Sequence, residues 1–228
     1  MKHSGRAIKA ALKLILISLI AVGVILAIGV FAAGIGTFVR ASAGVLIALW
    51  ALFVLFTLYF FRDPNARVPT GANLVLSPGH GKVDVIDTTT EPLFMGGECQ
   101  RISIFLSVID IHVQNAPVGG RIGFFKYSAG QFLSALKTES ATCNENVLLG
   151  FEASEPRGEK IGVRLLAGVL ARRIVPFVQQ GDAVARGDRI SLIQFGSRAE
   201  LYLPRNAKIK VKLNDHVVGG ETVLAVFE

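Results

Sequence analysis

The sequence predicts a mainly β domain that is built from quasi-repeated hairpins and preceded by an N-terminal pair of transmembrane helices. Three observations lead to this prediction. Two long stretches near the N-terminus carry no charged residue, runs of alternating apolar residues follow them, and a weak internal repeat lies near the C-terminus. The 228 residues are enough for one substantial domain plus an anchor.

The two uncharged stretches are Leu14–Val39 and Ala41–Phe61, separated by Arg40. Each is longer than the about 20 residues that cross the hydrocarbon core of a bilayer as a helix. A signal peptide has a shorter apolar core and a small-residue cleavage site, so these lengths argue against one. We expect two spans joined by a tight turn within 34–40. The alternatives are one continuous bent helix and a helical hairpin buried in a globular core.

Basic residues surround the expected hairpin on its outer sides, and the turn contains only Arg40. The others are Lys2, Arg6, Lys9 and Lys13 before the first span, and Arg62 and Arg67 after the second. Because basic flanks stay in the cytoplasm, both ends are expected on the cytoplasmic side of the inner membrane. The sequence therefore divides into an anchor, 1–61, and a cytoplasmic β-rich domain, 62–228.

The net charge of +7 does not indicate a nucleic-acid partner, because aromatic residues are not interleaved with a basic patch. A basic domain tethered to a bilayer suits anionic lipid headgroups, and a solvated face explains the charge equally well. Cys99 and Cys143 lack CxxC spacing, which fits a reducing compartment. They predict neither a metal site nor a required disulfide.

The region after the anchor reads as strands and turns. A linker with Pro64, Pro69 and Gly71 comes first, and the turn Ser77-Pro78-Gly79-His80-Gly81 follows it. Apolar residues alternate over 101–108, and a short helical turn is expected at 128–137. The alternating residues of 101–108 are Ile102, Ile104, Leu106 and Val108. Other strands are expected at 74–76, 83–86, 147–151, 160–166 and 167–175, the last with helix as an alternative.

The internal repeat lays residues 178–190 over residues 211–223, with an offset of 33. The copies share their valines, two acidic residues, a glycine and a closing β-branched residue. Such turns between short valine-rich strands predict two related hairpins folded over each other, which resembles the halves of biotinyl- and lipoyl-type domains. The predicted domain is therefore barrel-sandwich-like. Those carriers present a lysine between the halves, where this chain has Phe195-Gly196-Ser197-Arg198.

The bond between Gly196 and Ser197 carries the most chemical information. The serine hydroxyl can attack the preceding carbonyl, because glycine has no side chain to block the approach. If the chain breaks there, Ser197 becomes a new N-terminus that can be converted to a pyruvoyl group. Most Gly-Ser pairs are simple turns, so the rest of the chain has to decide between the two interpretations.

Five segments in a fixed order bear on that decision. They are Phe60–Pro64, Ile109–Pro117, Asn144–Asn146, Ala167–Ile174 and Phe195–Arg198. Together they resemble the phosphatidylserine decarboxylases in their short membrane-anchored form, over roughly the last three-quarters of the chain. Several motifs in one order are much more specific than any single motif.

The resemblance implies a proenzyme that cuts itself between Gly196 and Ser197. Residues 197–228 would become a small chain that stays associated with residues 1–196 and begins with a covalent pyruvoyl cofactor, with no metal. The implied reaction is pyruvoyl-dependent decarboxylation of phosphatidylserine to phosphatidylethanolamine. His112 is the candidate base for self-cleavage and the candidate acid in turnover, because imidazole titrates near neutral pH. A homodimer is compatible with the sequence.

The chain departs from the family pattern at one site position. The family carries an aspartate in a Ser-Pro-Ala-Asp-Gly segment, as part of a triad with the histidine and serine, and His80 stands in its place. Imidazole can accept a proton or hold His112 by a hydrogen bond, but it offers no fixed negative charge. Asp84 and Asp110 are neighbouring carboxylates that could supply one. We hypothesise that the chain still matures with His80.

Two other functions explain part of the sequence. A membrane-anchored, non-enzymatic adaptor with a sandwich domain accounts for the anchor and the repeat but not for Gly196-Ser197 with His112. A decarboxylase homologue could instead act on another serine-containing substrate, although the anchor favours a lipid. Arg172, Arg173 and Arg198 are candidate contacts for an anionic group of the substrate.

Overall fold

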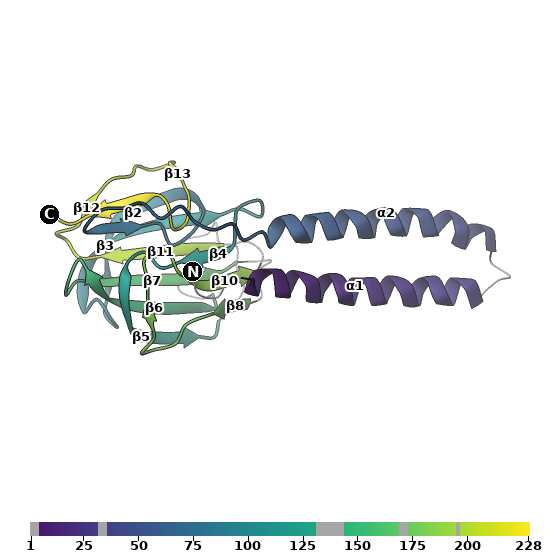
Figure 1. The fold of residues 1–228 in the computed structure, drawn as a ribbon, viewed down its shortest axis with the longest axis horizontal. Helices are drawn as coiled ribbons and strands as arrows, with labels where there is room; N and C mark the ends of the chain where they lie inside the picture. The colour runs from purple at the N-terminus through teal and green to yellow at the C-terminus, as the bar shows by residue number, and fades with distance from the viewer. Residues whose placement is uncertain (1–4, 32–35, 131–143, 169–172, 195–196) are drawn as a thin grey trace. The chain divides into compact units, whose positions relative to one another are not determined.

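The computed structural model describes residues 5–31, 36–130, 144–168, 173–194 and 197–228 of the chain (Figure 1). They belong to two compact units. The helical unit comprises Gly5–Asp63, and the β-rich unit contains Pro64–Glu228. The predicted fold class, a mainly β sandwich-like domain preceded by a helical hairpin, is confirmed.

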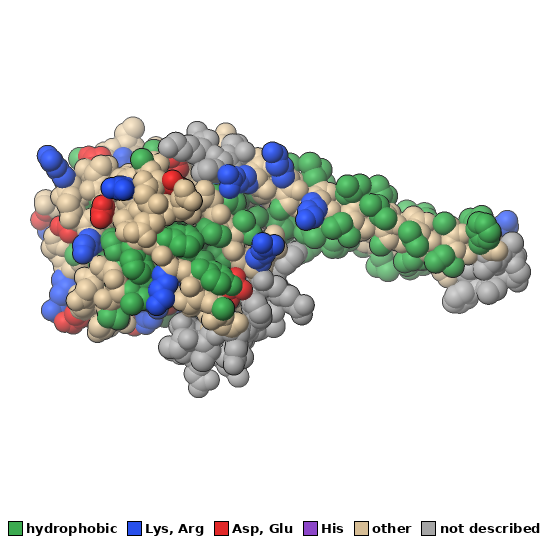
Figure 2. All heavy atoms as spheres, turned by 90° about the horizontal axis from the view of Figure 1, so that it is seen from below, with side chains coloured by type: hydrophobic (Ala, Val, Ile, Leu, Met, Phe, Trp, Pro, Cys, Tyr) green, Lys and Arg blue, Asp and Glu red, His purple; other side chains and the backbone are tan. Residues whose placement is uncertain are grey.

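The helical unit consists of α1 (Arg6–Phe31) and α2 (Gly36–Phe60). Both are long and apolar enough to cross a membrane, with mean hydropathies of 3.1 for α1 and 2.4 for 40–60. Figure 2 shows hydrophobic side chains over most of the visible surface of the helices. The turn expected within 34–40 was wrong for residues 36–40, which belong to α2, and α1 begins at Arg6, before the uncharged stretch. Charged residues continue a helix readily, so the uncharged stretch marks its apolar part and not its ends.

Polar side chains within the hairpin have partners. Trp50 Nε1 donates to Ser18 Oγ at 3.0 Å and so connects the two helices. Ser18 Oγ also lies 2.8 Å from the Ile15 carbonyl oxygen, and Thr57 Oγ1 donates to the Phe53 carbonyl at 2.7 Å. Such bonds satisfy groups that would find no water in a hydrocarbon environment.

The described residues of the β-rich unit form three sheets. The largest has eight strands in the order β13-β2-β3-β11-β7-β6-β5-β9, and two three-stranded sheets have the orders β1-β14-β12 and β4-β10-β8. The strand β11 lies in the middle of the large sheet (Figure 1). The strands are β1 (Leu74–Leu76), β2 (Gly81–Glu91), β3 (Gly97–Leu106), β4 (Val113–Asn115), β5 (Gly119–Ser128), β6 (Asn146–Glu155), β7 (Lys160–Ala167), β8 (Arg173–Pro176), β9 (Ala183–Val184), β10 (Arg189–Gln194), β11 (Ser197–Leu203), β12 (Lys208–Ile209), β13 (His216–Val217) and β14 (Val223–Val226).

One hydrophobic core unites the three sheets. Alternate residues of the large sheet, such as Ile104 in β3 and Leu201 in β11, are fully buried in it. The small sheets contribute Val75, Ile193 and Leu224 to the same cluster. Burial of alternate residues from facing sheets is the packing of a β-sandwich.

The strands predicted at 74–76, 83–86, 147–151 and 160–166 lie within β1, β2, β6 and β7. Ile102, Ile104 and Leu106 are fully buried, as the alternation predicted, but Val108 is 38% exposed. The strand ends at Leu106, and the apolar alternation continues by chance into the following turn. Of the helical turn expected at 128–137, Ser128 is the last residue of β5, and 131–137 lie outside the described residues. Of the strand expected at 167–175, Ala167 ends β7, 173–175 belong to β8, and 169–172 lie outside the described residues.

The predicted repeat corresponds to two similar structures. In the first copy, Asp182 Oδ2 accepts from the Gln179 amide at 2.9 Å, and in the second Asp215 Oδ2 accepts from the Lys212 amide at 2.8 Å. A two-residue strand follows each turn, β9 and then β13, and a longer strand comes next, β10 and then β14. Because β8 pairs with β10 and β12 pairs with β14, the offset of 33 relates two antiparallel strand pairs with similar connections.

The structure also contains a second repeat, with an offset of 39. The Leu76 amide donates to the Pro117 carbonyl and the Asn115 amide donates to the Pro78 carbonyl, both at 2.9 Å. Gly81 pairs with β13 in one half, and Gly120 pairs with β9 in the other. The β-rich unit therefore contains two similar halves that form backbone hydrogen bonds with each other. Its sequence signal is a shared Pro-x-x-Gly followed by a basic and then an aliphatic residue.

Candidate active site

The backbone of Ser197 begins β11, between two neighbouring strands. It pairs with Leu106 of β3 on one side and with Ala167 of β7 on the other. Gly196 lies outside the described residues. The sequence predicted that the Gly-Ser bond lies on a connection between strands, whereas Ser197 is the first residue of β11 and is paired on both sides.

The turn that contains His80 adjoins the same end of β11. A Cβ atom added to Gly79 would lie 3.5 Å from Ala199 Cβ and 3.6 Å from Leu106 Cδ1. Ser77 Oγ donates to the Gly79 carbonyl at 2.6 Å and so stiffens the turn. His80 is half-buried beside Gly219. The fold therefore places the position of the expected aspartate close to the start of β11.

His112 approaches from the loop that follows Leu106. Its side chain is fully buried, and its Nδ1 lies 2.9 Å from the Asp110 carbonyl oxygen. A carbonyl only accepts, so Nδ1 donates its proton in this contact. The His112 carbonyl accepts from the Ile193 amide at 3.0 Å, which anchors the loop to β10.

Asp110 holds this loop through its carboxylate. Oδ2 accepts from the Ser107 amide at 2.8 Å and from the Ser107 hydroxyl at 2.7 Å. Oδ1 lies 3.2 Å from Nε2 of His216, a residue of β13. Asp110 thus contacts His112 through its backbone and not through its charge. Its geometry suits a role in fixing the loop.

The segment Asn144–Asn146 supports the other side of residue 197. Asn144 Nδ2 donates to the Ala167 carbonyl at 2.7 Å, and the Glu145 carboxylate accepts from the Ile174 amide at 3.2 Å. Both side chains are buried. They connect the end of β7, which pairs with Ser197, to β8. The sequence motif identified this segment without assigning a role to it.

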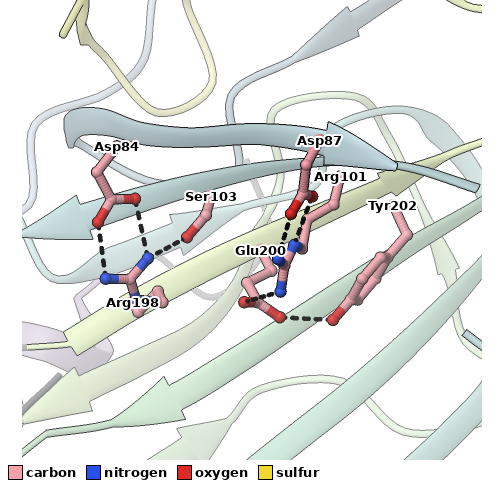
Figure 3. Close-up of polar contacts among 7 residues, drawn as sticks. All are labelled: Asp84, Asp87, Arg101, Ser103, Arg198, Glu200 and Tyr202. Carbon is pink, nitrogen blue, oxygen red and sulfur yellow. Dashed lines mark hydrogen bonds and ion pairs between the residues drawn. The ribbon is translucent and has the colours of Figure 1, made fainter. Parts of the chain in front are cut away.

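Arg198 is paired with the protein itself. Nη1 donates to Asp84 Oδ1 at 2.9 Å and to Ser103 Oγ at 2.5 Å, and Nη2 lies 2.7 Å from Asp84 Oδ2 (Figure 3). This ion pair bears on two roles that the sequence suggested, Asp84 as a negative charge for the candidate triad and Arg198 as a contact for an anionic group of the substrate. The carboxylate of Asp84 faces Arg198, and Arg198 already has an anionic partner. Of the other two candidate anion contacts, Arg173 is exposed and Arg172 lies outside the described residues.

A second polar group lies farther along the same face of β11. Arg101 donates to Asp87 through Nε at 2.9 Å and through Nη2 at 2.6 Å, and its Nη1 lies 3.3 Å from Glu200 Oε1. Tyr202 Oη donates to Glu200 Oε2 (Figure 3). Burial, followed by the Glu200 charge, raises the pKa of Tyr202 far above its usual range. The side chains of Arg198 and Glu200 therefore form polar contacts with other strands, and Tyr202 contacts Glu200 within β11.

Among the residues that the structure describes, no group of three or more His, Cys, Asp and Glu side chains could hold a metal ion. Cys99 is buried, and burial raises the pKa of its thiol. Cys143 lies outside the described residues.

Comparison with known proteins gives one consistent result. The sequence model of the family described as phosphatidylserine decarboxylase matches residues 53–225. A phosphatidylserine decarboxylase proenzyme of Desulfotalea psychrophila is 41% identical over 180 residues, which cover 79% of this chain and 83% of the relative. The proenzyme of that name from Symbiobacterium thermophilum is 39% identical over 203 residues, covering 89% and 90%. For that of Gluconobacter oxydans the identity is 43% over 176 residues, covering 76% and 77%.

Proposed function

The chain belongs to the phosphatidylserine decarboxylase family, a family of carboxy-lyase enzymes, and we propose that it converts phosphatidylserine to phosphatidylethanolamine after cutting itself between Gly196 and Ser197. The observation that carries this proposal is the meeting of three segments at one end of the large sheet. The backbone of residue 197, the turn of His80 and the loop of His112 all adjoin Leu106. Membership of an enzyme family argues against the adaptor alternative.

Self-cleavage needs a hydroxyl nucleophile and a base. In the proposed sequence Ser197 Oγ loses its proton and attacks the Gly196 carbonyl carbon, so that the C–N bond breaks and an ester replaces the amide. Removal of the Ser197 Cα proton then expels the Gly196 carboxylate from Cβ. The remaining enamine takes up one water and releases ammonia. The small chain then begins with a pyruvoyl group in place of Ser197.

The structure offers a suitable place for that group. Residue 197 is the first residue of a strand with neighbours on both sides, and a buried imidazole lies in an adjoining loop. The pyruvoyl group supplies a carbonyl that draws electrons from the substrate carbon that loses CO2. The chain's own residues must then hold the substrate, exclude water and deliver a proton to that carbon.

His112 is the proposed proton carrier in both reactions. The contact of Nδ1 with the Asp110 carbonyl orients the ring, and the imidazole is proposed to take the hydroxyl proton and later to return a proton. His80 is proposed to assist as a neutral hydrogen-bonding partner in the place of the family's aspartate. Neither role requires a metal.

The anchor supports a lipid substrate. Two helices are long and apolar enough to span a bilayer, and residues 61–63 alone separate α2 from the β-rich unit. We propose that 1–61 anchors the protein in the cell membrane and that 62–228 acts at its cytoplasmic surface. The basic flanks of the hairpin support this orientation.

Intact-mass analysis of the purified protein tests the function. We expect two chains, 1–196 and a pyruvoyl-capped 197–228, and release of CO2 from phosphatidylserine in detergent micelles. The variant Ser197→Ala should remain one uncut chain and release no CO2. Wild-type protein that stays intact, or a variant still cut at this bond, would refute the mechanism.

A further inference from the structure

We propose that Arg198, held by Asp84 and Ser103, is a positioning residue that keeps the beginning of the small chain in place after the bond before it is cut. This inference rests on the proposed self-cleavage. It assigns a role to an ion pair whose two members come from different chains of the mature protein. Asp84 would belong to the large chain and Arg198 to the small one.

Cleavage removes two restraints from residue 197. The covalent link to Gly196 is lost, and ammonia carries away the nitrogen, so this residue keeps a carbonyl acceptor but has no N–H donor. A strand that begins at a chain end also frays more readily than one inside a continuous chain. The reactive carbonyl therefore depends on the residues that follow it.

The Arg198 side chain is the first one able to replace those restraints. It lies one residue from the reactive position, and adjacent Cα atoms are only about 3.8 Å apart. Its guanidinium bonds Asp84 through both oxygens, at 2.9 and 2.7 Å, and adds Ser103 at 2.5 Å (Figure 3). These contacts connect the beginning of β11 to Ser103 in the adjacent strand β3 and to Asp84 in β2, the strand beyond it. Two parallel hydrogen bonds between a guanidinium and a carboxylate fix the orientation of the two groups as well as the distance between them.

Burial makes this pair more rigid than an ordinary surface pair. The Arg198 side chain is 11% exposed and that of Asp84 is 31% exposed. Water competes poorly for a guanidinium that is nearly buried, and the planar fork loses little freedom when it binds. The pair can therefore resist movement of the strand end without any covalent bond.

The second polar group provides a matched control. Asp87 also lies in β2, bonds an arginine through both oxygens and is 40% exposed. Its partner, Arg101, reaches β11 at Glu200, and Glu200 lies three residues from Ser197. That distance is about 10 Å along a strand. Asp84 and Asp87 both lie in β2, carry the same charge and pair with an arginine. Only the pair of Asp84 lies next to residue 197.

The test compares full-length wild type, Asp84→Asn, Arg198→Lys and Asp87→Asn in detergent. Intact mass gives cleavage and carbonyl content, hydrogen exchange of the cleaved protein reports on residues 198–203, and kinetics give kcat and KM separately. In Asp84→Asn and Arg198→Lys we expect normal cleavage and carbonyl content. Exchange at 198–199 should be about tenfold faster, because the pair no longer closes the strand end.

The kinetic expectation is a fall in kcat of about 10- to 100-fold with little change in KM, since a small displacement of a reacting group has effects of that size. Asp87→Asn should leave exchange at 198–199 and kcat within about twofold of wild type, because its arginine partner contacts β11 at Glu200, three residues from the reactive end. Arg198→Lys guards against a folding defect, because it keeps the charge and most of the volume.

Two results would overturn the inference. One is an Asp84→Asn protein whose exchange and kcat match those of Asp87→Asn. The other is an Asp84→Asn protein that is not cut, because the pair would then act on the bond and not on the mature end. An uncut wild type is a different failure, that of the proposed function, and the mass analysis detects it before any variant is compared.

Discussion

At the scale of single residues, the quasi-symmetry shows which positions are shared by the two halves and which differ. Gly81 and Gly120 occupy equivalent positions, with φ of 147° and 155°. The residue before each differs, His80 in one half and Gly119 in the other. His112 is likewise equivalent to Asn73 under the offset of 39. The glycines meet a need of the backbone that both halves share, whereas the two histidines occur in single copies at the candidate site.

His80 can be tested by replacing it. We expect His80→Asp to be cut at least as fast as wild type, because a carboxylate can also stabilise a charged imidazole. His80→Ala should be cut about 10- to 100-fold more slowly, the usual cost of losing a partner in proton transfer. Time courses on denaturing gels measure both. If only His80→Asp is cut, the hypothesis that the natural chain matures with histidine is wrong.

Tyr202 gives a prediction about stability. Its hydroxyl donates to a Glu200 carboxylate that is 2% exposed, so Tyr202→Phe should lower the free energy of unfolding by about 1–3 kcal/mol. Denaturant titration of the detergent-solubilised protein measures this change. Tyr127→Phe is the control, because Tyr127 is 51% exposed. Equal stability of the two variants would mean that the bond contributes nothing.

The same residue predicts a dependence on pH. The pKa of Tyr202 is higher in the folded state, so the folded state binds the hydroxyl proton more tightly than the unfolded state does. The stabilisation is complete below the unfolded value of about 10 and is lost as pH rises above it. Wild type should therefore lose more stability than Tyr202→Phe between about pH 9 and pH 11. Parallel curves would contradict this assignment.

At the scale of elements, Gly81, the first residue of β2, and Gly120, the second residue of β5, should be intolerant of side chains. A Cβ atom on Gly81 would lie 2.2 Å from the Phe105 carbonyl oxygen, and one on Gly120 would lie 2.1 Å from that of Glu152. Both substitutions by alanine should destabilise by at least about 1–3 kcal/mol. Only Gly81→Ala, next to His80, should also slow self-cleavage. Gly97→Ala, with no atom within 4 Å of the added carbon, is the control for both effects.

At the scale of the whole molecule, we expect the two mature chains to stay together without a covalent link. The small chain would contribute β11 to the middle of the large sheet, β13 to its edge, and β14 as the partner of β1. Removing it would open the hydrophobic core, since Leu201 and Leu224 are both fully buried. In detergent, the chains should elute together in gel filtration with or without a reducing agent. Separation without a denaturant would contradict this prediction.

The sequence by itself determined the two spans, the order of most strands, the 33-residue repeat and the Gly196-Ser197 bond. Each depends on local chemistry, namely hydropathy over a span, alternation along a strand, or two adjacent residues. Only the tertiary structure decided that Arg198 pairs with Asp84, that Asp110 supports His112 through its backbone, and that two halves clasp each other. Those contacts join residues far apart in the chain, and the alignment of antiparallel strands, which no short stretch of sequence specifies, brings them together.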